Sequence, residues 1–251
     1  MTEITVAAFY ADVPGKPSRA HEYLAYAKAS RQALKATNPG ARYVLLTDRA
    51  TAPIFNRFME VDVIATEGLP LMFQVMEAQK AFAEKVETDL LVLPDVDCIP
   101  NRDLSQAIPK DCRLAITHKG VKFRYKINNL AYARDCELTA WFLGCALEIL
   151  KTWPVDRHHW WGDQEAWGAV LGLPVEDLDA LPAGLRRVDG EEEHLIASTA
   201  RGEIHAYPNV THNCPGARDG SVRAEQLNAF MVHLKGARKQ HLDRFMSERF
   251  A

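Results

Sequence analysis

Two aspartates directly after an apolar run are the residues of this chain with the clearest chemical potential. The run Leu90–Leu93 has the length and composition of a buried parallel strand, and Asp95 and Asp97 follow it. If the strand continues, their i, i+2 spacing puts both carboxylates on one side. Ligands of open α/β sheets gather beyond the carboxyl ends of such strands. The pair therefore predicts a site for a hard divalent cation that also contacts the phosphates of a substrate.

A second Asp-x-Asp pair provides an internal comparison. Asp177 and Asp179 have the same spacing, but they follow the short segment Gly172–Glu176, which Pro174 interrupts. Proline is disfavoured inside a strand because it cannot donate to the ladder. We therefore interpret this second pair as part of a solvated loop.

A predicted helix from Gly162 begins with polar side chains behind two aromatic residues. Asp163 and Gln164 lie in its first turn, after Trp160 and Trp161. An aspartate there either serves chemistry or only stabilises the positive end of the helix dipole. The tryptophans either stack on a sugar face or pack in the core.

A third group of polar residues lies near the end of the chain. His233 is a possible metal ligand, Lys235 a cation suited to phosphate, and Gly236 permits close approach of the backbone. The alternative for His233 is a buried histidine with ordinary hydrogen bonds. A basic loop from His118 to Lys126 contains Arg124, whose guanidinium suits phosphate in a mobile lid, although a solvated run of charge is the alternative.

Helix and strand signals alternate in the first half of the chain, and this alternation predicts a parallel sheet with right-handed crossovers. The predicted strands are Ile4–Tyr10, Tyr43–Thr47, Val61–Ala65, Leu90–Leu93 and Arg113–Thr117, with helices from about Ser18 to Ala36 and from about Leu71 to Val86.

The second half is less regular. We expect a strand over Leu138–Leu143, helices over Cys145–Leu150 and Gly162–Leu171, short strands and loops from Leu173 to Asn213, and a helix-rich end from Arg223 that is interrupted at Gly236. Without repeats or linkers, the prediction is one domain over residues 1–251. Its nucleotide-binding half runs to about residue 117, and the part from about residue 118 completes the site.

Composition excludes several classes of protein. A hydrophobic fraction of 47% and a charged fraction of 25% are ordinary for a globular domain. The formal net charge of −3 gives no electrostatic reason to bind nucleic acid or an anionic membrane. The apolar stretches are too short to span a bilayer, and Glu3 without a basic region is unlike a secretory signal. Five widely spaced cysteines predict reduced thiols, so we expect a cytoplasmic protein.

The three polar motifs together resemble a known family. Asp95-Val96-Asp97, Gly162-Asp163-Gln164-Glu165-Ala166 and His233-Leu234-Lys235-Gly236, in this order after an initial strand, resemble the GT-A nucleotide-diphospho-sugar glycosyltransferases, especially their glycogenin-like and bacterial sugar-transferase branches. The resemblance implies a GT-A-like, Rossmann-type α/β domain with a mostly parallel sheet flanked by helices. It also implies transfer of a sugar from a nucleotide-diphosphate sugar, with a UDP-sugar as the expected donor, to a hydroxyl of an unknown acceptor (a glycan, lipid or small molecule).

The same resemblance implies roles for individual residues. Asp95, Asp97 and His233 would hold Mn²⁺ or Mg²⁺ on the donor diphosphate, and Lys235 with Gly236 would contact its phosphates. Asp163 or Gln164 would approach the sugar and the reacting centre. The residues expected to flank the nucleoside are Tyr10, Asp12 and Asp48.

Two alternatives stay open at this stage. The first is a haloacid-dehalogenase-like phosphatase, because such enzymes also carry Asp-x-Asp at a strand end. They have it near the start of the chain, however, and this function would give Asp163 and Gln164 no role. The segment Glu137–Gly144 lacks the Asn-x-Gly that is common in the GT-A family. The second alternative, which this departure leaves open, is a catalytically silent protein that binds sugar nucleotides.

Overall fold

The computed structural model describes residues 2–13, 15–63, 69–155, 158, 161–178 and 180–250, without the side chains of Asn129 and Glu192. Within these residues a nine-stranded sheet has the order β3-β2-β1-β4-β7-β6-β10-β9-β8. Its strands are β1 (Ile4–Phe9), β2 (Arg42–Thr47), β3 (Glu60–Val63), β4 (Leu90–Pro94), β6 (Leu114–His118), β7 (Ile127–Ala133), β8 (Leu185–Val188), β9 (Glu191–Thr199) and β10 (Gly202–Pro208). Strands β7 and β9 run against their neighbours, and the others share one direction. The predicted α/β fold with a mostly parallel sheet is confirmed.

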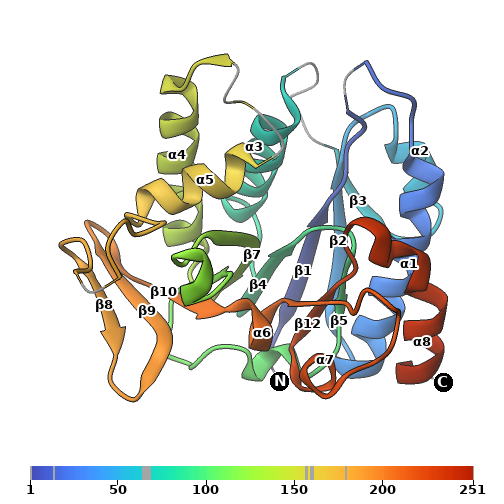
Figure 1. Cartoon of the computed structure of the whole chain (residues 1–251). Helices are drawn as coiled ribbons and strands as arrows, with labels where there is room; N and C mark the ends of the chain where they lie inside the picture. The colour runs from blue at the N-terminus through green and yellow to red at the C-terminus, as the bar shows by residue number, and fades with distance from the viewer. Residues whose placement is uncertain are drawn as a thin grey trace.

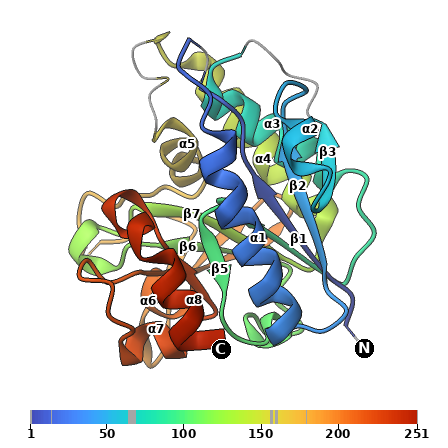
Figure 2. The same cartoon turned by 90° about the vertical axis from the view of Figure 1, so that its right-hand side faces the viewer.

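Helices cover both faces of the sheet (Figure 1). On one face lie α3 (Leu71–Ala83), α4 (Cys136–Thr152) and α5 (Gly162–Val170). On the other lie α1 (Ala20–Thr37), α2 (Ala52–Phe55) and α8 (Leu242–Phe250), with α8 beside α1 (Figure 2). Short helices α6 (Asn209–His212) and α7 (Ala224–Asn228) lie near the end of the chain. Strand β1 is buried on both faces, because Ala7 and Phe9 pack on the α3 side and Val6 and Ala8 on the α1 side.

Most first-half elements agree with the predicted ranges, with small differences at their ends. Helix α3 ends at Ala83 rather than near Val86, and β3 occupies Glu60–Val63. Ala65, at the end of the predicted third strand, lies outside the described residues, as do Trp160 and Asp179. None of the helices in the described part of the chain combines the length and hydropathy that a membrane-spanning helix needs.

The prediction of a strand over Leu138–Leu143 is wrong, because Cys136–Thr152 forms one continuous helix, α4. Its start is fixed by Asp135, whose carboxylate accepts a hydrogen bond from the backbone N–H of Leu138 at 2.7 Å. The buried residues of α4 recur at helical spacing and pack against α3. A short run of apolar and aromatic residues is compatible with a strand as well as with a helix. The N-cap at Asp135 and the packing against α3 stabilise the helix.

Replacing Asp135 tests this account of α4. Asp135→Ala should lower the free energy of unfolding by about 1 kcal/mol, because it removes the N-cap acceptor. Asp135→Asn is the matched control, since it keeps the acceptor but loses the charged contact with Arg113. Urea denaturation measures both. An equal loss in the two variants would assign the effect to the Arg113 contact instead.

Strand β7 and a second, small sheet were not predicted. Strand β7 lies in the sheet between β4 and β6, antiparallel to both. A second, small sheet has the order β11-β12-β5, with β5 (Cys98–Pro100), β11 (Cys214–Pro215) and β12 (Met231–His233). This small sheet joins the end of the chain to the segment directly after Asp97.

Candidate functional site

The acidic pair lies at the carboxyl end of the central strand β4, but not in a strand. β4 ends at Pro94, Asp95 makes a single bridge with Phe9 of β1, and the chain then turns before β5. The backbone N–H of Cys98 donates to the carbonyl of Asp95 at 3.0 Å and closes this turn. The prediction that strand geometry places both carboxylates on one side is therefore wrong. A turn brings them together instead, at the sheet edge that was expected.

Strand β12 brings His233 to the acidic pair. It pairs antiparallel with β5, with His233 opposite Cys98, and the N–H of Leu234 donates to the carbonyl of Asp97 at 3.0 Å. As a result the Nε2 atom of His233 lies 3.0 Å from Oδ1 of Asp97 and 3.6 Å from Oδ2 of Asp95. Both His233 and Asp97 are buried. Residues more than 130 positions apart thus meet through one short ladder.

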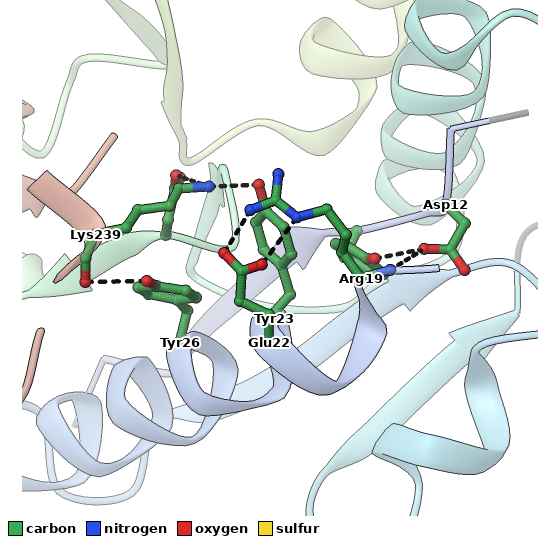
Figure 3. Close-up of polar contacts among 8 residues, drawn as sticks. Asp12, Arg19, Glu22, Tyr23, Tyr26 and Lys239 are labelled. Atoms are coloured by element: carbon green, nitrogen blue, oxygen red, sulfur yellow. Dashed lines mark hydrogen bonds and ion pairs between the residues drawn. The ribbon is translucent and has the colours of Figure 1, made fainter. Parts of the chain in front are cut away.

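Lys239 completes this cluster, and the sequence analysis missed it. Gly236 has a φ of +61°, a conformation that favours glycine, and the chain then forms a short 3₁₀ helix over Gly236–His241. The Nζ atom of Lys239 lies 3.0 Å from Oδ2 of Asp97. Figure 3 shows Lys239 beside helix α1, where its ammonium contacts the hydroxyl of Tyr23 and its carbonyl accepts from Tyr26 at 3.0 Å. The signal that was available is a second lysine shortly after Gly236.

The charges of the cluster shift the two aspartates in opposite directions. Burial opposes the ionisation of Asp97, but His233 and Lys239 outweigh it and hold the pKa of this carboxyl well below its usual range. Burial, against the effect of His233 and together with the charge of Asp97, raises the pKa of Asp95 to about 6. Asp97 is therefore ionised at neutral pH, whereas the ionisation of Asp95 depends on the charges around it.

Helix α5 carries Asp163 and Gln164 at its first turn, as predicted. Its position is fixed by the fully buried Trp167, whose ring meets Phe142 of α4 edge-on at 5.6 Å between centroids. Gly168 also fixes α5, because a Cβ at this position would lie 2.6 Å from the carbonyl oxygen of Leu173. Burial and, after it, the charge of Asp95 raise the pKa of Asp163 to about 7. Asp163 is therefore a buried carboxyl able to hold or release a proton near neutral pH.

The three residues predicted to flank a nucleoside lie together at the ends of β1 and β2. The hydroxyl of Tyr10 donates to Oδ1 of Asp12 at 2.5 Å, and the N–H of Asp12 donates to Oδ2 of Asp48 at 3.1 Å. Asp48 also accepts from the N–H of Thr51 at 2.8 Å, ahead of α2. The structure thus brings these residues together, and it gives Asp48 a structural role in the turn after β2.

Of the two basic residues predicted to contact phosphate, Lys235 lies beside β7 and Arg124 lies in an exposed loop. The Nζ atom of Lys235 lies 3.5 Å from Oδ1 of Asn128, on β7, whereas Lys239 is the lysine that contacts Asp97. Arg124 has an exposed side chain and a left-handed backbone, with a φ of +52°. Lys119, from the same loop, is half-buried. Burial and, after it, the charges of Lys235 and Lys126 lower its pKa to about 8, against the effect of Asp163.

The donor atoms around His233 fit a divalent cation. Nε2 of His233 and Oδ1 of Asp97 lie 3.0 Å apart and form a hydrogen bond. Two ligand atoms at right angles on an ion with bonds of about 2.1 Å have the same separation, so a cation could replace the proton between these atoms. The thiol of Cys98 also lies within 4.8 Å of these atoms. Burial raises the pKa of this thiol well above its usual range, so it stays protonated and suits neither a hard cation nor a nucleophilic role. Asp97 and His233 are therefore the two residues of this group with ligand atoms suited to a hard cation, and Asp95, which the resemblance adds to them, lies 3.6 Å from His233.

A surface cavity of about 400 Å³ contains none of these residues. It lies along α1 and is lined by Lys28, Arg31, Gln32, Lys35 and Phe58. The perturbed carboxyls instead gather where β4 ends, close to β12 and the start of α5. Perturbed groups that converge on a strand end indicate a functional site more specifically than an open surface hollow does.

Comparison with known proteins gives a match in structure and none in sequence. No protein-family model matches the chain, and no curated protein matches it. Among solved structures, a glycosyltransferase involved in the glycosylation of the major capsid of PBCV-1 has a similar fold. The TM-score is 0.54 and the identity 14%, over 96% of this chain and 99% of that chain. At this identity the likeness shows the fold.

Proposed function

We propose that this protein is a metal-dependent glycosyltransferase that moves a sugar from a nucleotide-diphosphate sugar, in the first place a UDP-sugar, to an acceptor hydroxyl. The observation that carries the proposal is the meeting of Asp95, Asp97 and His233 at the carboxyl end of β4. Oxygen and imidazole ligands at this separation suit Mn²⁺ or Mg²⁺. The fold shared with a glycosyltransferase is consistent with it.

A metal bound by these three residues would act as a Lewis acid toward the charge that develops on a departing nucleoside diphosphate. Lys239 would add a fixed positive charge to the same place, since its ammonium already lies on Asp97. Lys235 is the first lysine of this segment and Lys239 the second, and Gly236 allows the backbone to turn between the two. The sequence predicts that Lys235 contacts phosphate, and we extend this role to Lys239.

Asp163 and Gln164 would act on the sugar side. Asp163 is only 2% exposed, and it lies close enough to Asp95 to respond to its charge. A carboxyl that titrates near neutrality is able to exchange a proton with an acceptor hydroxyl or to stabilise positive charge on the sugar when ionised. Tyr10, Asp12 and Asp48 would flank the nucleoside at the neighbouring strand ends, and the exposed Arg124 would reach the phosphates from its loop.

Release of the nucleoside diphosphate tests this proposal. The purified protein is incubated with a panel of nucleotide-sugars, with Mn²⁺, with Mg²⁺ and with a chelator, and products are separated by chromatography. We expect nucleoside diphosphate to accumulate with at least one donor, only when metal is present. Calorimetric binding without turnover would favour a silent binding protein. Phosphate release that fluoroberyllate blocks would favour a phosphatase.

A further inference from the structure

The ammonium of Lys239 lies between the acidic pair and helix α1. It lies 3.0 Å from Oδ2 of Asp97, and it also donates a hydrogen bond to the hydroxyl of Tyr23 (Figure 3). The same ammonium lies 4.0 Å from the centre of the Tyr23 ring, a distance at which an aromatic face attracts a cation. Because the side chain of Lys239 is only 16% exposed, these contacts take the place of most of its water.

The segment that carries Lys239 has little packing of its own. None of the residues of the 3₁₀ helix Gly236–His241 is buried. Its backbone is held to α1 where the hydroxyl of Tyr26, a buried residue, donates to the carbonyl of Lys239 at 3.0 Å. A lysine ammonium sits on a long flexible stem, so it stays at one place only where contacts fix it. The position of this ammonium therefore depends on α1 as well as on Asp97.

Two further contacts fix the ring of Tyr23. Its centre lies 4.7 Å from that of the Tyr10 ring, after the end of β1, and the guanidinium of Arg19 lies 5.4 Å from it. The charge of Arg19 is already paired, because its Nε donates to Glu22 at 2.8 Å. The ring thus touches both a residue expected to flank the nucleoside and the lysine expected at the diphosphate. Tyr23 can therefore act through Tyr10 or through Lys239.

We propose that Tyr23 is a positioning residue, whose hydroxyl and ring hold the ammonium of Lys239 beside Asp97, where negative charge develops on a departing nucleoside diphosphate. This inference rests on the proposed function. In the described part of the chain the hydroxyl of Tyr23 has its hydrogen bond with Lys239 alone. Asp95 and His233 reach the cation from the turn after β4 and from β12, so loss of this hydroxyl leaves them in place.

A double-mutant cycle tests this role through ligand affinity. UDP, GDP, ADP, CDP and dTDP are titrated with Mn²⁺ into the wild type by calorimetry, and the tightest of them is titrated into Tyr23→Phe, Lys239→Met and the double variant. Tyr23→Phe keeps the ring and removes the hydroxyl. We expect this change to weaken binding of the diphosphate by about tenfold when Lys239 is present. In the Lys239→Met background it should weaken binding by less than about twofold, because the residue through which Tyr23 acts is absent.

Tyr207→Phe is the matched control, since Tyr207 is a buried tyrosine of β10, outside α1. This variant should bind the diphosphate as the wild type does. Thermal melting checks that each variant is folded. Lys239→Met leaves the buried carboxylate of Asp97 without its ammonium. If that variant fails to fold, Lys239→Gln replaces it in the cycle, because an amide keeps hydrogen-bond donors without the charge.

The outcomes separate the role of Tyr23 from the function on which it rests. Equal losses of affinity with and without Lys239 would overturn the inference, since Tyr23 would then act through Tyr10 or through the fold alone. An unchanged affinity in Tyr23→Phe would overturn it as well. In both cases the wild type still binds a diphosphate, so the proposed function stands. If the wild type binds none of the diphosphates, the proposed function fails, and the role of Tyr23 fails with it.

Discussion

Asp97→Asn is expected to abolish metal-dependent turnover, with a loss of about 10²-fold or more, because it removes the fixed charge that the cation needs. The same change should lower the free energy of unfolding by roughly 3 kcal/mol, since it leaves two buried or partly buried partners, His233 and Lys239, without their carboxylate. Nucleoside diphosphate release and urea denaturation measure the two effects.

Two further variants show whether these effects belong to the site. Asp177→Asn changes the other Asp-x-Asp pair at an exposed position and should leave turnover as in the wild type. Combining Lys239→Met with Asp97→Asn should recover part of the lost stability, because the unpaired ammonium is gone. Full turnover by Asp97→Asn would remove the metal assignment.

Low pH should reduce the free energy of unfolding because Asp97 becomes protonated. The pKa of Asp97 is lower in the folded chain than in the unfolded chain, so its contribution to stability is present above the unfolded value of about 4. This contribution is lost as the pH falls below that value toward the folded pKa. The wild type should therefore lose more stability than Asp97→Asn between about pH 4 and pH 2.

Asp163→Asn is expected to change stability and activity in opposite directions. The pKa of Asp163 is about 7 in the folded chain against an ordinary value of 3.8. Between these two values the unfolded chain has lost a proton that the folded chain keeps, so this carboxyl reduces stability progressively as the pH rises. Above about pH 7 the full penalty applies. The amide should therefore stabilise the protein at pH 8, by roughly 2–4 kcal/mol, and leave it unchanged near pH 3.

The activity of Asp163→Asn should fall by about 10²-fold or more, since an amide neither accepts nor releases the proton. Two charged side chains act on Asp163: Asp95 raises its pKa, and Lys119 lowers it. Hydrogen bonds from the backbone N–H groups of Asp163 and Gln164 also lower it. Thermal melting at pH 3 and pH 8 and a turnover assay form the test. A variant that is active at the wild-type rate, or less stable at pH 8, would contradict the role of Asp163 as a buried carboxyl with a raised pKa.

The sequence predicted the elements that carry their own local signal. Leu90–Leu93 reads as a buried strand because both of its faces need apolar residues, and β4 is indeed buried throughout. Helix α5 was predicted because polar residues precede an apolar helical pattern, and Asp163 lies at its start. These signals are local, so they do not depend on what the rest of the chain does.

Other features depend on contacts that no local pattern contains. Strand β7 begins with Ile127 and two asparagines, and it becomes a strand because β4 and β6 offer hydrogen-bonding edges on either side of it. The segment around Phe142 is helical because Asp135 caps it and α3 packs against it. Propensity is a weak guide where tertiary partners supply most of the free energy.

The amino-acid sequence by itself determined which residue types follow the central strand, namely two aspartates, and that a histidine and lysines occur near the end of the chain. Only the tertiary structure decided their partners. The ladder between β12 and β5 sets His233 against Asp97, and the turn at Gly236 gives Lys239, rather than Lys235, to the same carboxylate. Side-chain distances across more than a hundred residues are set by strand register and backbone turns, which form only when the whole fold does.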